Sequence, residues 1–387
     1  MGDIRKKVLL GMSGGVDSSV AAGLLLEQGF EVIGAFMKNW TEIKCDGETK
    51  ECGWRTERRD AMRVAAKLGI PFVTFDFEKE YRELVVENLY QEYAVGRTPN
   101  PDVLCNKYVK FDLFVKEADR LGCDFIATGH YARIIDGRIL AGTDDNKDQT
   151  YFLWAIPKSV LPRVLFPVGA MTKPEVREKA RELGLPTAEK KDSTGICFVG
   201  EVDIRAFLKE RIPEDPGEIV TTSGEVVGTH EGIAFYTIGQ RHGLNVGGGT
   251  PYYVVDKKPE TKQLIVSSNF HPALFQKTVV ASSTNWFRRP SIGDKVSARV
   301  RYRQPLQTCT IVSMTTPNPS LNEGGETWVN DKTVPLSNVS PPSARRGQGV
   351  VLDEIVVEFD EPVRAVTSGQ SIVLYDGDEM IGGGIIA

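Results

Sequence analysis

Short apolar runs and amphipathic stretches alternate along the first half of the chain. Four apolar runs predict buried strands, at 7–12, 31–37, 71–76 and 125–128. The stretches between them predict helices at 17–28, 54–68, 78–95 and 107–121, and a glycine directly follows each range. Repeated strand–helix–strand units are typical of a parallel sheet covered by helices on both faces. Thr172 and Glu175 have the spacing of a capping box and predict the start of a further helix that ends near Gly184.

The pattern changes after about residue 212, where short β-rich runs are separated by Gly and Pro. One series of runs predicts a small β domain, at 218–220, 232–238, 252–256 and 263–266. A second series predicts a terminal β barrel, at 295–302, 307–313, 350–359 and 371–375. We therefore expect an α/β plus β fold in three domains, with boundaries at 1–212, 213–277 and 278–387. Residues 315–348 are rich in Pro, Ser, Asn and Gly, and predict a long hairpin insertion in the last domain.

Composition excludes several protein classes. The 41% hydrophobic content of the 387 residues can fill real cores, which argues against a disordered chain. No apolar run approaches the ~18 residues of a membrane span, and the first residues lack the features of a signal peptide, so we expect a cytoplasmic protein without a membrane partner. The net charge of −5 speaks against nucleic acid only weakly, because charges farther than ~8 Å are screened at physiological salt.

The six cysteines are too sparse for a disulfide scaffold, and none of them forms a CxxC pair. A zinc ribbon and a thioredoxin-type redox site are therefore not expected. Any functional cysteine in this chain is expected to be a lone reactive thiol.

The strongest chemical motif is a glycine- and serine-rich loop that follows the first predicted strand and opens the first predicted helix. Consecutive backbone N–H groups in such a loop, together with a helix N-terminus, form a site for phosphates. The motif is neither a Walker loop nor a GxGxxG loop, and it resembles the SGGxDS loop of ATP pyrophosphatases, which implies an adenylated substrate and pyrophosphate as products. Asp17 could cap the helix or help to hold Mg²⁺, and the alternative is a simple glycine-rich turn with a capping Asp. The loop consists of Gly11, Met12, Ser13, Gly14, Gly15, Val16, Asp17 and Ser18.

Two cysteines lie in polar loops that suggest reactivity. Cys105 follows a loop stiffened by Pro99 and Pro101, and is expected at or just before a helix N-terminus, which with Lys107 favours a thiolate. Lowering a thiol pKa from ~8.5 to ~6.5 raises the ionised fraction at pH 7 from ~3% to ~75%. Asp102 could accept a proton or cap the following turn. Cys197 ends a second polar loop, 92 residues later, and either thiol could instead be a buried structural residue.

Two further signals are weaker. Residues 286–303 carry six basic side chains with interleaved aromatic ones, which suits RNA contact or a solvated strand face. His130 follows a predicted strand end, where α/β sheets place ligands, although a satisfied core histidine explains it as well.

Together these motifs resemble the ATP-dependent tRNA-uridine 2-sulfurtransferases, also called tRNA-specific 2-thiouridylases. The resemblance covers nearly the whole chain, and residues 315–348 depart from compact members of that family. The matching segments, in the family's order, are AFMKNW at 35–40, GRTPNPDVLCNKYVKFD at 96–112, ATGHYAR at 127–133, DQTYFL at 148–153, KKDSTGICF at 190–198, YTIGQRHGL at 236–244, RYRQ at 301–304 and SGQS at 368–371.

The resemblance implies a two-step reaction that uses ATP and Mg²⁺ on tRNA. ATP would adenylate the 2-oxygen of the wobble uridine, and a persulfide on Cys197 would deliver sulfur to carbon 2. Cys105 would help to release the sulfur, leaving a Cys105–Cys197 disulfide. The residues matching the family's ATP contacts are the phosphate loop, Met37 and Gly129. Those matching its target-base loop are Asn100, Pro101 and Asp102. Those matching its tRNA contacts are His130, Lys147, Asp148, Gln149, Arg301, Tyr302 and Gln370.

Three alternatives remain open at this stage. The chain could be another ATP pyrophosphatase that forms lysidine or an amide, or an RNA-binding module with a degenerate nucleotide loop. In a third alternative, Cys105, Cys197 and Asp102 would bind an iron–sulfur cluster, and no persulfide would form. The sequence does not specify whether the sulfur donor is a cysteine desulfurase or a sulfur-relay protein, which tRNAs are substrates, or the oligomeric state.

Overall fold

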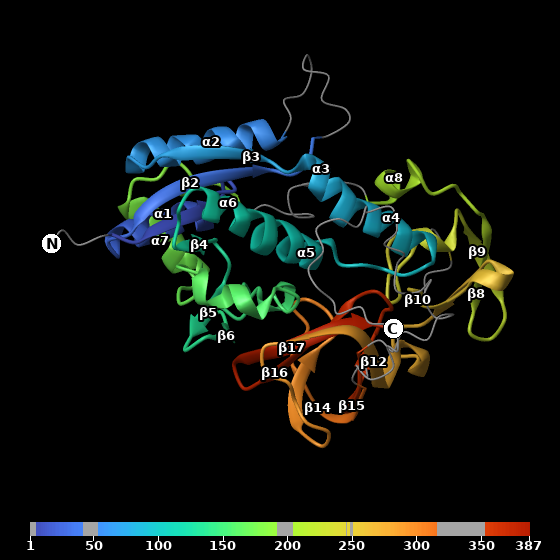
Figure 1. Ribbon diagram of the computed structural model, residues 1–387. Helices are drawn as coiled ribbons and strands as arrows, with labels where there is room; N and C mark the ends of the chain where they lie inside the picture. Colours follow the sequence, from blue (N-terminus) through green and yellow to red (C-terminus); the bar gives the residue numbers. More distant parts are fainter. Residues whose placement is uncertain (1–4, 42–52, 192–203, 245, 248–250, 316–352) are drawn as a thin grey trace, which may run out of the picture.

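The computed structural model describes residues 5–41, 53–191, 204–244, 246–247, 251–315 and 353–387 (Figure 1). The predicted insertion at 315–348 lies outside the described residues, apart from Thr315. Within the described part of the chain, no helix combines the length and apolar character needed to cross a bilayer.

A five-stranded parallel sheet forms the core of the N-terminal part and confirms the predicted α/β class. Its strands, in spatial order, are β3 (Phe72–Asp76), β2 (Glu31–Lys38), β1 (Lys7–Gly11), β4 (Phe125–Ala127) and β7 (Val164–Leu165). The chain builds outward from β1 first on one side and then on the other, so the order reverses between β1 and β4. Ligands of open α/β sheets bind at the carboxyl ends of the strands at such a reversal.

Helices cover both faces of this sheet because its strands are apolar on both sides. Val8 and Leu10 of β1 belong to one buried cluster, whereas Leu9 belongs to the other. The first cluster is closed by α1 (Val16–Glu27), α2 (Gly53–Leu68) and α7 (Lys173–Glu182). The start of α7 confirms the predicted capping box, since the Glu175 carboxylate accepts hydrogen bonds from Thr172 N and Oγ1.

The other face is covered by two long helical stretches, each with a π-helical middle segment. The first consists of α3 (Glu78–Tyr81), π-helical Arg82–Val86 and α4 (Glu87–Ala94), close to the predicted 78–95. The second consists of α5 (Pro101–Leu104), π-helical Cys105–Leu113 and α6 (Phe114–Arg120). The prediction of a start at 107 was wrong, because Asn100 caps the helix and Pro101 occupies its first position.

A small mixed sheet follows, after the short α8 (Ile204–Lys209). Its strands are β10 (Tyr253–Lys258), β11 (Gln263–Ser267), β8 (Gly217–Thr221) and β9 (Val226–His230). The strand predicted at 232–238 is absent from these described residues. Gly232 adopts a φ of 151° and Phe235 N donates to its carbonyl, so a 3₁₀ turn forms at Ile233–Phe235 instead.

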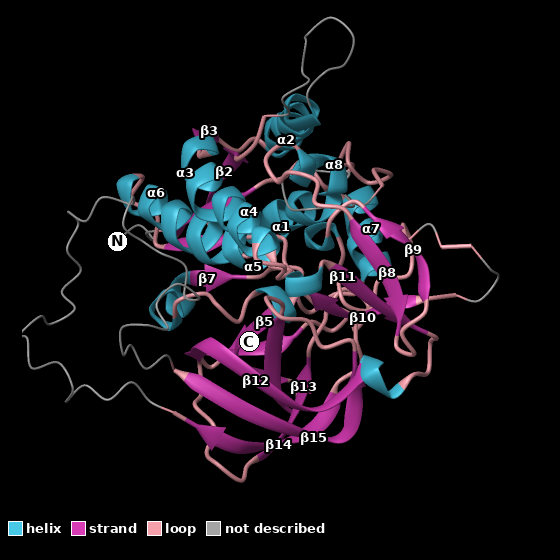
Figure 2. Cartoon of the chain, turned by 90° about the vertical axis from the view of Figure 1, so that its right-hand side faces the viewer, coloured by secondary structure: helices cyan, strands magenta, loops and turns pink. Residues whose placement is uncertain are grey.

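A closed six-stranded barrel occupies the C-terminal part, as predicted (Figure 2). Its strands are β12 (Phe275–Trp286), β15 (Glu354–Arg364), β14 (Gln307–Met314), β13 (Lys295–Arg299), β16 (Ser371–Asp376) and β17 (Glu379–Ile386), and β12 pairs with β17 to close it. Because β12 begins at Phe275, the predicted boundary at 277 falls inside a strand, and the exact domain boundaries stay a prediction.

The barrel is joined to the N-terminal part by contacts that the sequence pattern did not reveal. A hairpin of β5 (Ala132–Ile135) and β6 (Arg138–Ala141) adds to the barrel sheet alongside β17. Buried side chains complete the joint, since the Tyr151 hydroxyl donates to Ser371 O at 2.9 Å and Trp154 Nε1 donates to Ser371 Oγ at 2.9 Å.

Candidate active site

The glycine- and serine-rich loop lies between β1 and α1, at the point where the sheet order reverses. Gly15 is the residue that precedes α1, and no side chain caps the helix there. The first-turn N–H groups of a helix have no intrahelical acceptor, so they face an anion in such a loop. Ser18 Oγ accepts from Ser13 N at 3.2 Å and donates to Gly15 O at 3.2 Å, which closes the loop on itself.

Two glycines are required by close approaches at this loop. Gly14 has a φ of 78°, and a Cβ there would lie 2.2 Å from Glu57 O of α2. A Cβ on Gly129, just after β4, would lie 2.7 Å from Ser18 N at the start of α1. Any side chain at either position would displace the backbone of the loop. Met37, the other predicted ATP contact, is buried, and its Cε would lie 3.0 Å from a Cβ on Gly11.

The carboxylate of Asp17 is engaged within the protein. Lys173 Nζ donates to both of its oxygens, at 2.7 and 2.9 Å, and the Tyr131 hydroxyl donates to Oδ1 at 2.7 Å. The capping alternative for Asp17 was wrong, because Gly15 occupies the cap position. Sequence reasoning missed Lys173, although the capping box that begins one residue earlier marked its place.

The described side chains do not form a resident Mg²⁺ site. Among them there is no group of three His, Cys, Asp or Glu residues that could hold a metal ion. Mg²⁺ in nucleotide enzymes is commonly held by substrate phosphates with one or two carboxylates. Asp17, the carboxylate of the loop itself, is already engaged by Lys173 and Tyr131.

Lys190 connects the segment that follows α7 to the phosphate loop. Lys190 Nζ donates to Gly14 O at 3.0 Å and to Asp60 Oδ2 at 2.7 Å. Residues 192–203 follow, and the predicted persulfide residue Cys197 therefore lies outside the described residues. The chain resumes at Ile204, which lines the cavity described below.

Cys105 is fully buried and lies one helical turn further into its helix than expected. The helix begins at Pro101, where Asn100 Oδ1 accepts hydrogen bonds from Asp102 N at 3.2 Å and Val103 N at 3.4 Å. Cys105 is the first residue of the π-helical segment, and such segments are frequent at functional sites. Asp102 precedes it by three residues, so both side chains lie on one face of the helix.

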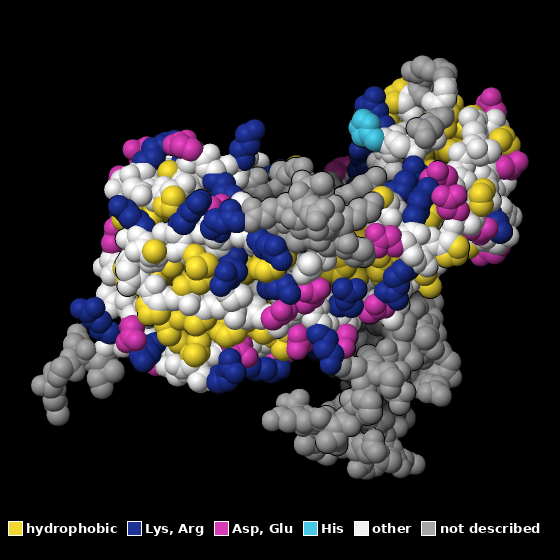
Figure 3. Space-filling model, turned by 90° about the horizontal axis from the view of Figure 1, so that it is seen from above, with side chains coloured by type: hydrophobic (Ala, Val, Ile, Leu, Met, Phe, Trp, Pro, Cys, Tyr) yellow, Lys and Arg dark blue, Asp and Glu magenta, His cyan; other side chains and the backbone are white. Residues whose placement is uncertain are grey.

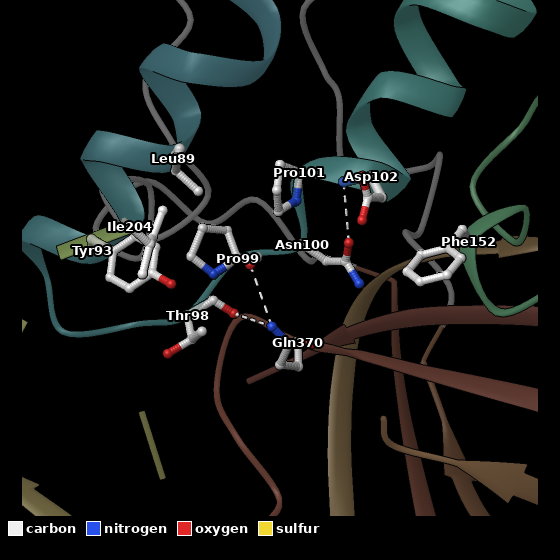
Figure 4. A pocket seen from close by; sticks show the side chains of 10 residues that line it. All are labelled: Leu89, Tyr93, Thr98, Pro99, Asn100, Pro101, Asp102, Phe152, Ile204 and Gln370. Carbon is white, nitrogen blue, oxygen red and sulfur yellow. Dashed lines mark hydrogen bonds between the residues drawn. The ribbon is translucent and has the colours of Figure 1, made fainter. Parts of the chain in front are cut away.

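A cavity of about 330 Å³ opens where α4, the start of α5, α8 and the barrel meet (Figure 4). The predicted target-base residues Asn100, Pro101 and Asp102 all line it. Its other lining residues are Leu89, Tyr93, Thr98, Pro99, Phe152, Ile204 and Gln370. In Figure 4 Gln370 lies beside Thr98 and Pro99, whereas Phe152 lies on the side of Asp102, away from Tyr93 and Ile204. Phe152 packs against Tyr302 at 4.5 Å between ring centroids. Sequence reasoning missed Phe152, which no local motif distinguishes from a core aromatic residue.

Several predicted tRNA contacts have their polar atoms engaged inside the protein. His130 is 7% exposed, with Nδ1 2.7 Å from Thr128 Oγ1 and Nε2 3.4 Å from Lys110 Nζ. Burial, with the Lys110 charge second, lowers the pKa of His130 well below its usual value, so the ring is neutral. The Asp148 carboxylate is also buried, and it accepts hydrogen bonds from Gly142 N and Thr150.

Other predicted contacts connect neighbouring segments. Gln149 Oε1 accepts from Tyr131 N, whereas the backbone N–H of Lys147 donates to Asp144. Arg301 Nη2 donates to Ile238 O and to Thr367 Oγ1, and burial lowers its pKa from the usual value. The role of these residues in tRNA binding stays a prediction.

Three of the six basic side chains in segment 286–303 pair with carboxylates of the described residues. Arg288 pairs with Asp376 and Glu379, and Arg289 pairs with Asp353. Arg299 lies 3.6 Å from Asp148 and stacks on the Tyr375 ring. Figure 3 shows the opposite side of the molecule, from above, whereas the barrel lies at the bottom of Figure 1; on the face that it shows, Lys and Arg side chains are interspersed with Asp and Glu rather than gathered into one patch.

Comparison with known proteins assigns the family. Three family models match in order along the chain: "tRNA methyl transferase HUP domain" at 6–201, "tRNA methyl transferase PRC-barrel domain" at 205–268 and "Aminomethyltransferase beta-barrel domain" at 349–386. The tRNA-specific 2-thiouridylase MnmA of Bacillus subtilis (strain 168) is 45% identical over 389 residues, which span 98% of this chain and 94% of that protein. Its counterpart in Pseudomonas savastanoi pv. phaseolicola (strain 1448A / Race 6) is 46% identical over 393 residues, with the same coverage. The chain belongs to the tRNA-specific 2-thiouridylase family.

Similarity to solved structures is much weaker. The structure of a 4-thiouridine synthetase–RNA complex with bound ATP is 21% identical, and the match covers 54% of this chain and 50% of that chain. Its TM-score is 0.32.

In this 2-thiouridylase family member, the phosphate loop and the cavity both contact one helix. The helix that begins beside the cavity also packs on the phosphate loop, since Phe114 Cε1 would lie 3.8 Å from a Cβ on Gly11. Met37 and Cys105 belong to the same buried cluster on that face of the sheet. One helix therefore connects the residues around the cavity with those of the phosphate loop.

We predict that Gly14→Ala raises the Kd for ATP at least about tenfold. An L-residue in this backbone conformation costs ~1–2 kcal/mol, and the added Cβ would also strike Glu57 O at 2.2 Å. Calorimetric titration with ATP measures the effect. The matched control is Gly122→Ala, where φ is 67° but nothing lies within 4 Å of the added Cβ, so stability falls and the Kd for ATP does not change. Equal Kd values for Gly14→Ala and the wild type would contradict the assignment of this loop to phosphate binding.

Proposed function

We propose that this chain thiolates the wobble uridine of tRNA at carbon 2, using ATP. The observation that carries the proposal is the placement of Asn100, Pro101, Asp102 and Cys105 on one helix start, with the cavity on one side and the phosphate loop packed against the same helix. The tRNA-specific 2-thiouridylase relatives support the same reaction class over almost the full length of the chain.

The chemistry requires an ATP site and a sulfur atom beside the same base. The 2-oxygen of uracil attacks the α-phosphorus of ATP, the bond to the bridging oxygen breaks, and pyrophosphate leaves. Sulfur then adds to carbon 2, the carbon–oxygen bond breaks, and AMP leaves with the former uracil oxygen. Without adenylation that oxygen would have to leave as oxide, which is a far poorer leaving group.

The base must leave the anticodon stack to enter the cavity, at a cost of a few kcal/mol. Aromatic side chains offset this cost when an extruded base stacks on them, and Phe152 offers such a ring at the cavity wall. The two prolines of the loop, Pro99 and Pro101, also line the cavity and stiffen its wall.

The sulfur is proposed to arrive as a persulfide on Cys197. Ile204 lines the cavity and follows Cys197 by seven residues, a stretch that spans at most ~25 Å when extended. After the terminal sulfur has bonded to carbon 2, attack by the Cys105 thiolate on the Cys197 sulfur breaks the sulfur–sulfur bond. The products are 2-thiouridine and a Cys105–Cys197 disulfide, with Asp102 as the proposed acceptor of the Cys105 proton.

Two further participants belong to this proposal. Mg²⁺ would enter as the counter-ion of the ATP phosphates, as part of the substrate rather than as a resident metal. A cysteine desulfurase or a sulfur-relay protein would charge Cys197. A cytoplasmic location stays a prediction.

We propose that Asn100 selects uracil through the polarity of its amide. The oxygen accepts two backbone hydrogen bonds at the start of α5, which fixes the amide orientation. In Figure 4 its Nδ2 points away from α5, on the side of Phe152. A group that can only donate suits the 4-carbonyl of uracil and does not suit the 4-amino group of cytosine.

We expect Cys105→Ser and Cys197→Ser to lower the yield of 2-thiouridine at least about 100-fold while tRNA-dependent pyrophosphate release continues, because adenylation does not need the thiols. The measurement is mass spectrometry of digested tRNA after incubation with ATP, Mg²⁺ and a desulfurase. Cys123→Ser is the matched control, since Cys123 lies 4% exposed outside the cavity, and burial raises the pKa of its thiol. Full thiolation by both site variants would contradict the roles proposed for the two thiols, and full turnover of ATP and tRNA without any 2-thiouridine would favour an amide- or lysidine-forming enzyme instead.

Asn100→Asp should keep the helix cap, because Asp caps as well as Asn, but it replaces the donor by an acceptor. We expect uridine-dependent AMP formation to fall at least about tenfold, and the preference for uridine-34 over cytidine-34 tRNA to shrink. Asn269→Asp controls for the added charge, since Asn269 Oδ1 accepts from Arg364 away from the cavity. An unchanged uridine-to-cytidine ratio would rule out this role of the amide.

A further inference from the structure

The segment from Gly96 to Asp102 is held by parts of the molecule that are remote in sequence. It leads from the end of α4 to the start of α5 and supplies Thr98, Pro99 and Asn100 to the cavity wall. Its backbone polar groups need partners, because Thr98 and Pro99 are buried. These partners come from the barrel and from the small mixed sheet.

The barrel contributes the turn that precedes β16. Ser368 O accepts from Thr98 N at 2.9 Å, and Gln370 Nε2 donates to Thr98 O at 3.0 Å and to Pro99 O at 3.3 Å (Figure 4). Gly369 permits this approach, since its φ is 89° and an added Cβ would lie 2.9–3.0 Å from the backbone of Thr98. The barrel thus touches the wall of the cavity directly.

The small mixed sheet contributes Lys257 of β10. Its Nζ donates to Gly96 O at 2.8 Å, and within the described residues no carboxylate forms an ion pair with it. Burial lowers the pKa of Lys257 to about 8. Gly96 O lies just beyond the end of α4, where the helix dipole favours a cation. A mostly buried ammonium without an acidic partner is costly, so the hydrogen bond to Gly96 O, its one acceptor among the described residues, indicates what the side chain does there.

We propose that Lys257 and Gln370 are positioning residues that clamp the backbone carbonyls of Gly96, Thr98 and Pro99, and thereby set the wall of the base cavity before RNA binds. The proposal deepens the proposed function, on which its consequence for thiolation rests. Lys257 and Gln370 come from different domains, and together they donate hydrogen bonds to three backbone carbonyls within residues 96–99. The cavity wall therefore depends on both domains being docked.

This role differs from the tRNA contact that the family resemblance implies for Gln370. Its Nε2 donates to Thr98 O and Pro99 O within the protein, so the side chain has a structural partner without RNA. An RNA contact affects the protein only when tRNA is present, whereas a clamp orders the loop in its absence.

Hydrogen exchange of the full chain without tRNA tests the clamp. In Lys257→Met and in Gln370→Glu, we expect the amides of residues 96–102 to exchange about tenfold faster, with barrel peptides away from the loop unchanged. In thiolation assays kcat should fall about tenfold, whereas the Kd for tRNA should stay within about twofold. Two exposed side chains provide matched controls: Lys258→Met, which removes a partner of Asp256 on the same strand, and Gln276→Glu on β12.

Wild-type exchange in the loop of both variants would overturn the proposal, and weaker tRNA binding by Gln370→Glu alone would make Gln370 an RNA contact. Equal acceleration in the two control variants would also overturn it, because the effect would then be general destabilisation. If Lys257→Met fails to fold, Gln370→Glu still tests the barrel contact. The exchange measurement uses neither ATP nor sulfur, so it judges the clamp even if the wild type proves not to thiolate uridine.

Discussion

The contact between the turn at Gly369 and the backbone of Thr98 is the constraint on which the site depends. No side chain fits between the two backbones, so barrel and catalytic domain must meet at this point or lose the cavity wall. The same short loop then enters the helix that carries Asp102 and Cys105. Docking of the barrel is therefore translated, through a few hydrogen bonds, into the position of the residues proposed to hold the base and to release the sulfur.

The charged side chains around the phosphate loop are likewise held in position by hydrogen bonds within the protein. Lys173 and Tyr131 hold Asp17, and Lys190 holds the carbonyl of Gly14, so the loop is tied to α7 and to the segment that leads toward Cys197. The residue Lys173 is 9% exposed and its ammonium lies within an ion pair, where its charge is screened much less than at the surface. Binding of a nucleotide here adds negative charge to a site that already contains fixed cations and helix N–H groups.

Local signals in the sequence predicted most of the N-terminal fold. Buried strands, glycine-ended helices and the Thr172 capping box were recognised because each depends on neighbours within a few residues. The helix start at Pro101 was missed although Asn followed by Pro is a local signal, and the turn near Gly232 was mistaken for a strand because its composition is β-rich. The β5–β6 hairpin could not be assigned to the barrel sheet, because its partner β17 lies more than 200 residues later.

The candidate site shows the same limit. The phosphate loop and the Asn100–Asp102 segment were identified from motifs, and the structure adds the cavity that the latter lines. Asp148 and Arg301 match tRNA contacts in sequence, yet Asp148 lies 3.6 Å from Arg299 of the barrel and Arg301 donates to Ile238 O before β10, and burial at such a joint is not a local property. Lys257 carries no motif at all, and its position opposite Gly96 emerges only from the packing of β10 against the end of α4.

The most direct measurement of the central claim follows the oxygen that uracil loses. A tRNA whose wobble uridine carries ¹⁸O at position 2 is incubated with the protein, ATP, Mg²⁺ and a sulfur donor, and the released AMP is analysed by mass spectrometry. Adenylation of the uracil oxygen predicts one ¹⁸O in each AMP formed per 2-thiouridine. Unlabelled AMP, released together with thiolated tRNA, would contradict the account.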